Sequence, residues 1–115
     1  EELDKKDIVV IHVEEPDESG HSGSFENKRS SIEMIDREIV SRMLKWNKDT
    51  LRVLVMPDHP TPISIQTHTD DPVPFMMWGH GIISNGAGRF TEAQAKGTGI
   101  FIENGYNIMD KLVYK

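Results

Sequence analysis

The chain has 115 residues, of which 37% are hydrophobic and 28% charged, and this composition allows one modest globular domain. Its formal net charge of −6 argues against a nucleic-acid-binding surface, and no apolar run approaches the roughly 20 residues that span a bilayer. Because cysteine is absent, disulfide frameworks and thiolate zinc sites are excluded, any metal must be held by Asp, Glu or His, and a cytoplasmic location is expected.

The first predicted element is a strand at residues 8–13, with the sequence Ile-Val-Val-Ile-His-Val. A nearly continuous apolar run of this kind is typical of a strand that is buried on both faces of a parallel sheet. The next segment, residues 14–23, is rich in acidic residues, Pro and Gly, which favours a loop. Since this segment contains Asp17 and His21, the predicted strand ends in a loop that carries potential metal ligands.

The following elements complete a strand–helix–strand unit. Ser24 is expected to cap an amphipathic helix of about five turns from Phe25 to Trp46, because apolar residues recur there at spacings of three or four. The helix should stop within residues 47–50, and a second strand is predicted at residues 51–56. Such a unit forms a right-handed crossover between parallel strands. It would bring the loops after both strands to the same edge of the sheet.

Three further elements are predicted in the second half of the chain. The apolar segment 73–78 indicates a strand with Pro74 at its start or on a sheet edge, because proline cannot donate a ladder hydrogen bond. A short helical turn is expected at residues 92–95 and a terminal helix at residues 104–114. The glycine-rich segment 85–88 lacks the Lys-Ser/Thr and the strand and helix context of a phosphate-binding loop, so that interpretation is rejected.

Carboxylate and imidazole side chains follow both predicted strands. The first strand is followed by Asp17 and His21, and the second by Asp58, His59 and, further along, His68. In open α/β sheets, ligands bind beyond the strand ends, because side chains there leave the core but are still held by it. Prolines on both sides of the Asp58–His59 pair would rigidify the loop, which suits ligands that must keep their geometry. These five side chains predict a site for two metal ions.

Other polar residues near these loops are weaker candidates. His12 lies inside the predicted strand and His80 has no carboxylate neighbour in the sequence, so both are left out of the ligand set. The remaining acidic side chains of the two loops are expected to be solvated or to orient the ligand imidazoles. They are Glu14, Glu15, Glu18, Asp70 and Asp71.

Five stretches of the chain form one ordered pattern, at residues 11–21, 35–36, 57–62, 67–75 and 99–106. Together they resemble the archaeal type of cofactor-independent phosphoglycerate mutase, within the alkaline phosphatase superfamily. The Pro-Thr-Pro that follows Asp58 and His59 is similar to this type, whereas a Gly usually follows the Asp-His pair in the other branch. The resemblance implies an α/β fold in which residues 1–115 form the C-terminal part of a three-layer α/β/α core with a mostly parallel sheet.

The resemblance also implies a division of the ligands between two ions. One ion would be bound by Asp17, His21 and His68, and the other by Asp58 and His59. The family's nucleophilic Ser and its N-terminal Asp ligand have no counterpart here, so no catalytic nucleophile is expected within this chain. Its first residues show neither an initiator Met nor a signal peptide. The N-terminal half of the catalytic core is therefore expected to be a missing partner.

The activity implied by the resemblance is interconversion of 2-phosphoglycerate and 3-phosphoglycerate, an isomerase reaction of glycolysis and gluconeogenesis that passes through a phosphoserine. Asp and His ligands suit two Mn²⁺ or Zn²⁺ ions best and Mg²⁺ less well. Partners would be the phosphoglycerate substrate and the missing half, without nucleic acid or membrane, and this chain alone would be inactive. Two alternatives stay open: a phosphatase or phosphopentomutase of the same superfamily, and a non-catalytic metal-binding fragment.

Overall fold

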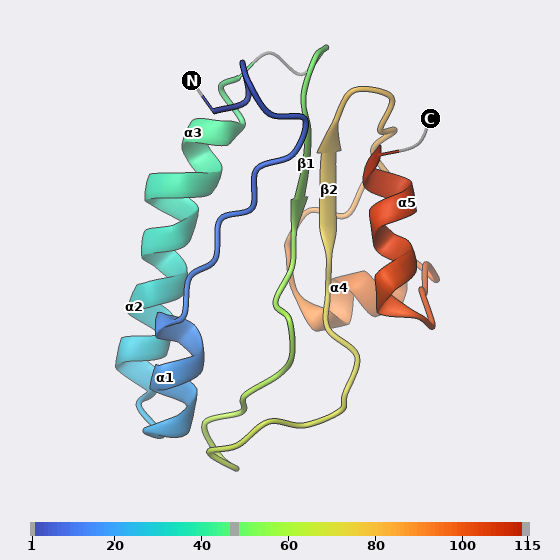
Figure 1. Cartoon of the computed structure of the whole chain (residues 1–115). Helices are drawn as coiled ribbons and strands as arrows, with labels where there is room; N and C mark the ends of the chain where they lie inside the picture. The colour runs from blue at the N-terminus through green and yellow to red at the C-terminus, as the bar shows by residue number, and fades with distance from the viewer. Residues whose placement is uncertain (1, 47–48, 114–115) are drawn as a thin grey trace.

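A computed structural model describes residues 2–46 and 49–113 of the chain. Figure 1 shows a long helical segment on one side, a small sheet in the middle and short helices on the other side. In chain order the elements are α1 (Glu15–His21), α2 (Phe25–Ile35), a π-helical segment η1 (Asp36–Val40), α3 (Ser41–Met43), β1 (Arg52–Val55), β2 (Met76–Gly79), α4 (Glu92–Gly97), a 3₁₀ turn η2 (Gly105–Asn107) and α5 (Ile108–Val113). Within the described ranges, every helix is too short or too polar to cross a membrane.

Residues 8–13 do not form the predicted strand. They form no backbone ladder with another described segment, and their apolar side chains are exposed, with Val10 83% accessible. A segment becomes a strand only when its N–H and C=O groups find ladder partners, and hydrophobicity alone does not supply them. The predicted strand–helix–strand crossover is therefore not seen among the described residues. In Figure 1, however, the segment runs in the same direction as β1, as neighbouring strands of a parallel sheet do.

The predicted loop at residues 14–23 is mostly helix, since α1 covers Glu15–His21. Pro16 stands in the first turn, where its missing N–H costs no helical hydrogen bond. Three acidic residues, Glu15, Asp17 and Glu18, also lie in that turn, where negative charge interacts favourably with the helix dipole. The same residues that suggested an irregular segment are thus the residues that start a helix.

The long helix begins where the sequence predicts. Ser24 is its N-cap, and the hydroxyl oxygen accepts a hydrogen bond from the backbone N–H of Asn27. Helical structure continues through α2, η1 and α3 to Met43, a few residues short of the predicted end. The expected stop at residues 47–50 lies partly outside the described residues, because 47 and 48 are not among them. This helix packs against α1.

The described sheet has two strands, β1 and β2, which pair antiparallel with Arg52 opposite Gly79 and Val55 opposite Met76. Both strands were predicted, and β2 starts after Pro74, as the missing N–H of that proline requires. The predicted mostly parallel sheet is not seen within the described ranges. The β1 edge away from β2 has no partner strand among the described residues.

The buried hydrophobic side chains among the described residues are Val53 of β1 and Ile108 of α5, which are 3% and 6% exposed. Contacts between β1 and α5 form this core, and the guanidinium of Arg52 strengthens it by donating to the carbonyl oxygens of His80, at 2.7 Å, and Leu112, at 3.3 Å. The predicted terminal helix is present as η2 and α5, although residue 114 lies outside the described ranges. The predicted turn at residues 92–95 is the first part of α4.

Candidate metal centre

Two predicted ligands lie on one face of α1. Asp17 and His21 are four residues apart, which places their side chains next to each other on a helix. The Asp17 Oδ2 and His21 Nε2 atoms are 3.4 Å apart. The helix, which the sequence did not predict, is therefore what brings this pair together.

The other predicted ligands lie on the loop after β1, which folds back on itself before β2. The backbone N–H of Thr69 donates to the carbonyl of Pro60 at 3.2 Å, and Gln66 turns the chain with a left-handed φ of 57°. The carbonyl of Gln66 accepts from Nδ1 of His21 at 3.0 Å. This contact fixes the loop against α1 and leaves the Nε2 lone pair of His21 directed at the site.

The first group of close contacts involves Asp17, His21 and His68. Nε2 of His68 lies 3.2 Å from Oδ1 of Asp17 and 3.1 Å from Nε2 of His21. These two imidazole rings are tilted at 50° with their centroids 4.9 Å apart. Three potential ligand atoms thus converge from α1 and from the loop after β1.

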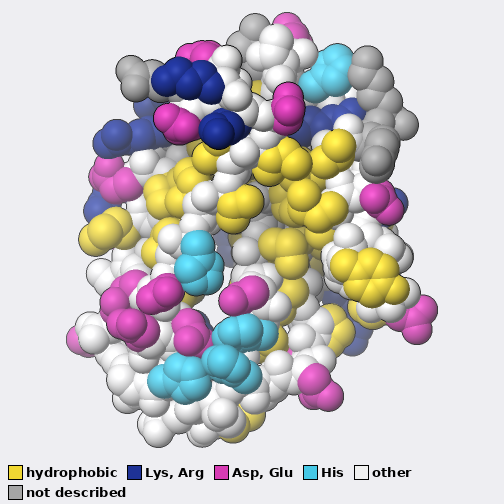
Figure 2. Space-filling model, in the orientation of Figure 1, with side chains coloured by type: hydrophobic (Ala, Val, Ile, Leu, Met, Phe, Trp, Pro, Cys, Tyr) yellow, Lys and Arg dark blue, Asp and Glu magenta, His cyan; other side chains and the backbone are white. Residues whose placement is uncertain are grey.

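Asp58 and His59 lie beside this group. Oδ2 of Asp58 is 3.5 Å from Nε2 of His59, and Nδ1 of His59 is 4.0 Å from Oδ1 of Asp17. As predicted for a consecutive pair that serves one site, both residues lie beyond the end of β1. Ligand atoms of Asp17, His59 and His68 all lie within 4.8 Å of one another. All five predicted ligands therefore belong to one continuous cluster, on the face where Figure 2 shows histidine and acidic side chains gathered together.

Thr61 is a site residue that the sequence analysis missed. It is only 4% exposed, and its hydroxyl donates to Oδ1 of Asp17 at 2.5 Å and lies 3.2 Å from Nδ1 of His59. This hydrogen bond, together with the nearby histidines, lowers the pKa of Asp17 and so favours the ionised form of the carboxylate. The signal in the sequence was its place two residues after His59 in the proline-rich loop.

The backbone of Thr61 is held from two sides. Nζ of Lys28, on α2, donates to its carbonyl oxygen at 2.5 Å. Gly20, on α1, lies so close that a Cβ built on it would be 2.5 Å from the same oxygen. The position of Thr61 is therefore set by both helices.

We expect Gly20→Ala to destabilise the protein by about 1–3 kcal/mol, because the new methyl group would overlap the backbone of Thr61. Gly97→Ala in α4 is the matched control. A Cβ there meets nothing within 4 Å, so this change should stabilise the helix by about 0.5–1 kcal/mol. Urea unfolding of both variants measures the difference, and equal shifts would show that the contact between Gly20 and Thr61 does not constrain the fold.

The weaker candidates fall in different places. His12 and Glu14 line a hollow of about 230 Å³ next to Asp17, Asp58 and His59, so both border the cluster. Glu15 instead accepts a hydrogen bond from Ser19 at 2.9 Å, and Asp71 accepts one from Thr69 at 2.9 Å. His80 follows β2 at the opposite end of the sheet from the cluster (Figure 1).

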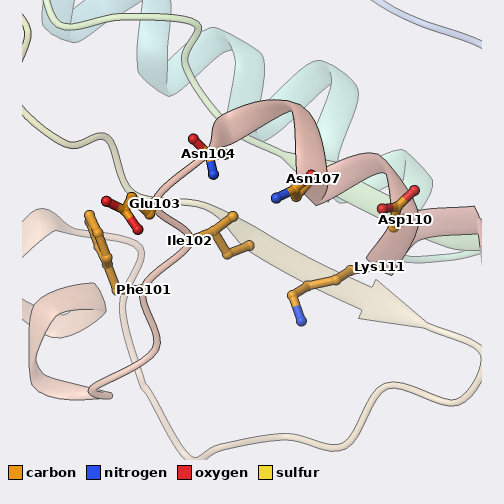
Figure 3. Close-up of a pocket in the computed structure, with 7 residues that line it drawn as sticks. All are labelled: Phe101, Ile102, Glu103, Asn104, Asn107, Asp110 and Lys111. Atoms are coloured by element: carbon orange, nitrogen blue, oxygen red, sulfur yellow. The ribbon is translucent and has the colours of Figure 1, made fainter.

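A larger hollow of about 550 Å³ lies near the C-terminus, and Figure 3 shows its lining. Its polar side chains carry mixed charges and project from η2, α5 and the preceding segment in different directions. They do not converge on a common point as the cluster around Asp17 does. The lining residues are Phe101, Ile102, Glu103, Asn104, Asn107, Asp110 and Lys111.

The donor set around Asp17 fits a divalent cation. Because Nδ1 of His21 donates to a carbonyl, its Nε2 presents a lone pair to the Asp17 carboxylate and to Nε2 of His68. Electron-rich atoms in this arrangement repel each other unless a proton or a cation lies between them. A metal ion would satisfy all three at once. The separation of 3.1 Å between the two nitrogens is close to the roughly 3.3 Å expected for two imidazoles on one tetrahedral Zn²⁺ with bonds of about 2.0 Å.

Comparison with known proteins identifies the family. The sequence profile described as "Metalloenzyme superfamily" matches residues 1–114, which is nearly the whole chain. The chain belongs to the metalloenzyme superfamily. Its members include alkaline-phosphatase-like proteins, and the membership agrees with a cluster of Asp and His side chains that could hold a metal ion.

Curated relatives are named as mutases. The chain is 52% identical over 81 residues to the 2,3-bisphosphoglycerate-independent phosphoglycerate mutase of Methanosarcina acetivorans, covering 68% of this chain and 20% of that protein. It is 37% identical to the probable mutase of Geobacter sulfurreducens, covering 98% of this chain and 29% of the relative. The predicted resemblance to the cofactor-independent mutases is thereby confirmed. The chain spans less than a third of the length of these relatives.

A solved structure supports the fold. The PH0037 protein from Pyrococcus horikoshii is 25% identical and superimposes with a TM-score of 0.72, covering 84% of this chain and 29% of that one. The arrangement of helices and strands described above is therefore also found as part of a much longer polypeptide.

Proposed function

We propose that this chain supplies the ligands of a two-metal centre in a cofactor-independent phosphoglycerate mutase. One ion is bound by Asp17, His21 and His68, and the second by Asp58 and His59. The observation that carries the proposal is the convergence of the two Nε2 atoms and the Asp17 carboxylate within 3.1–3.4 Å. The names of the relatives supply the reaction class.

Ring geometry supports this division of the ligands. Two imidazoles on one ion point their nitrogens at it while the rings spread apart, as the 4.9 Å between the ring centroids of His21 and His68 allows. The rings of His59 and His68 lie closer together, with centroids 3.7 Å apart and the planes tilted at 34°. Nε2 of His59 lies 3.5 Å from Oδ2 of Asp58, which favours a second ion between these two side chains.

The two ions are Mn²⁺ or Zn²⁺, with Mg²⁺ less favoured, because imidazole nitrogen is a poor ligand for Mg²⁺. When bound, a metal pair about 4 Å apart can stabilise the attacking and leaving oxygens of a phosphoryl transfer. The side chains of this chain do the positioning: Asp17 and His21 from α1, and Asp58, His59 and His68 from the loop after β1. The buried Thr61 and the prolines of that loop limit their movement.

The rest of the catalytic core is proposed to come from the part of the mutase that lies outside this chain. Residues 1–115 then form the C-terminal part of a three-layer core. Its mostly parallel sheet includes residues 8–13 and continues from the β1 edge on which no described strand pairs. The nucleophilic Ser that carries the phosphate between the 2- and 3-positions of glycerate also lies outside. A cytoplasmic location stays a prediction.

The activity is tested on the full-length protein after removal of metal with a chelator. We expect conversion of 3-phosphoglycerate to 2-phosphoglycerate to fall to background without metal and to return with Mn²⁺. Release of inorganic phosphate in place of the isomer would identify the alternative, a phosphatase that uses the same ligands. Full activity in the metal-free protein would contradict the proposed centre.

A further inference from the structure

Thr61 contacts ligands of both proposed ions without occupying a ligand position itself. Its hydroxyl oxygen is 2.5 Å from Oδ1 of Asp17, in one group, and 3.2 Å from Nδ1 of His59, in the other. We propose that Thr61 is a positioning residue that holds the Asp17 carboxylate and keeps the proton of His59 on Nδ1, so that Nε2 is free to bind the second ion. This inference rests on the proposed function.

The direction of each hydrogen bond follows from counting protons. An ionised carboxylate can only accept, so the single hydroxyl proton of Thr61 goes to Asp17. Toward His59 the hydroxyl oxygen can then only accept, and the contact requires a proton on Nδ1. In neutral imidazole the other nitrogen, Nε2, then carries the lone pair. One hydroxyl thus fixes the orientation of a carboxylate and the tautomer of a histidine.

In this tautomer Nε2 of His59 carries the lone pair, and this nitrogen lies beside the carboxylate of Asp58. Nε2 of His59 lies 3.5 Å from Oδ2 of Asp58, whose other oxygen accepts the backbone N–H of His59 at 3.0 Å. Oδ2 and Nε2 therefore form a pair of electron donors at a separation that suits two ligands of one cation. With the proton on Nε2, His59 would donate a hydrogen bond to Asp58. That nitrogen could then not bind a metal ion.

The surroundings of Thr61 hold its backbone in place and keep water from its hydroxyl. The side chain is 4% exposed, so water does not compete for the hydroxyl. Lys28 holds the carbonyl oxygen, and Gly20 lets α1 approach the backbone closely. Because Asp17 is on α1 and His59 is on the loop, Thr61 couples the two segments that carry all five ligands.

The experiment compares Thr61→Val, which removes the hydroxyl but keeps the shape, with Thr61→Ser, which keeps the hydroxyl. Thr98→Val is the control. The Thr98 hydroxyl is partly buried and donates to the backbone oxygen of Ala95 at 2.7 Å, but Thr98 caps the C-terminal end of α4, away from the cluster. Two properties of the full-length protein are measured. The His59 tautomer is read from ¹⁵N chemical shifts of the metal-free protein, and Mn²⁺ and Zn²⁺ affinities are read from calorimetry.

We expect the parent, Thr61→Ser and Thr98→Val to keep His59 protonated on Nδ1 and to bind metal alike. Thr61→Val should lose the tautomer preference and about 10- to 100-fold in affinity, the usual cost of removing a partner of a metal ligand. A parent His59 protonated on Nε2, or equal affinity in Thr61→Val and the parent, would overturn the proposal. The tautomer of His59 in the parent tests the proposal even if Thr61→Val fails to fold. A parent that binds neither ion would instead refute the proposed metal centre.

Discussion

Replacing Asp17 with Asn should abolish metal binding at the first site and reduce mutase activity of the full-length protein by more than about 100-fold. The expected loss exceeds the 10- to 100-fold cost of removing an outer partner, because Asp17 is itself a proposed ligand. The Asn oxygen can still accept the hydroxyl of Thr61, so the shape of the site is retained while the negative charge is lost. Calorimetry with Mn²⁺ and the phosphoglycerate assay measure the two effects.

Asp110→Asn is the matched control for this charge change. Asp110 is an exposed carboxylate on α5, away from the cluster, and its replacement should leave both measurements unchanged. The melting temperature of metal-free Asp17→Asn should also stay close to that of the parent, because Asp17 is partly exposed. Equal losses of activity and of metal-free stability would indicate that Asp17 serves the fold and not the metal.

The 115-residue chain expressed alone should show no mutase or phosphatase turnover with Mn²⁺. Phosphoryl transfer through a covalent intermediate needs an activated nucleophile next to the metal. Three hydroxyls of α1 and its neighbouring segments already have other partners: Ser19 donates to Glu15, Ser22 to the carbonyl of Ser19, and Thr61 to Asp17. The chain alone should also be only marginally stable, because the described structure buries few apolar side chains and exposes many, including Val10, Ile83 and Phe101.

A stopped assay of 3-phosphoglycerate conversion checks this expectation, first with the chain alone and then after adding the remaining part of the mutase as a separate polypeptide. We expect activity only after the addition. Robust turnover by the chain alone would show that it contains its own nucleophile, and alanine substitution of Ser19, Ser22, Thr61 and Ser64 would then locate it.

The sequence predicted which side chains come together in the cluster, because Asp and His rarely stand side by side in a proline-rich loop after an apolar strand. Asp58 and His59 stand between prolines directly after an apolar strand, and β1 forms where the apolar run lies. Thr61 could not be predicted as a partner of Asp17, since the two residues are 44 positions apart in the sequence and meet only because the loop packs against α1. Its place two residues after His59 marks Thr61 as close to the site but does not identify Asp17 as its partner.

The fold was predictable where local interactions decide it. Ser24 caps the long helix as its hydroxyl and the spacing of apolar residues predict. Residues 8–13 have the composition of a buried strand, but a strand depends on a partner far away in the sequence, and none of the described residues provides one. In α1, the helix-start preferences of Pro16 and the acidic first turn prevail over the loop-forming tendency of Gly20 and its neighbours.

The most direct test of the two-metal centre is a crystal structure of the full-length protein with Mn²⁺, with the ions located by anomalous scattering. Two peaks about 4 Å apart are predicted, one in contact with Asp17, His21 and His68 and the other with Asp58 and His59. A single peak shared by all five side chains would contradict the division of ligands. Peaks that none of these residues touches would contradict the proposed centre itself.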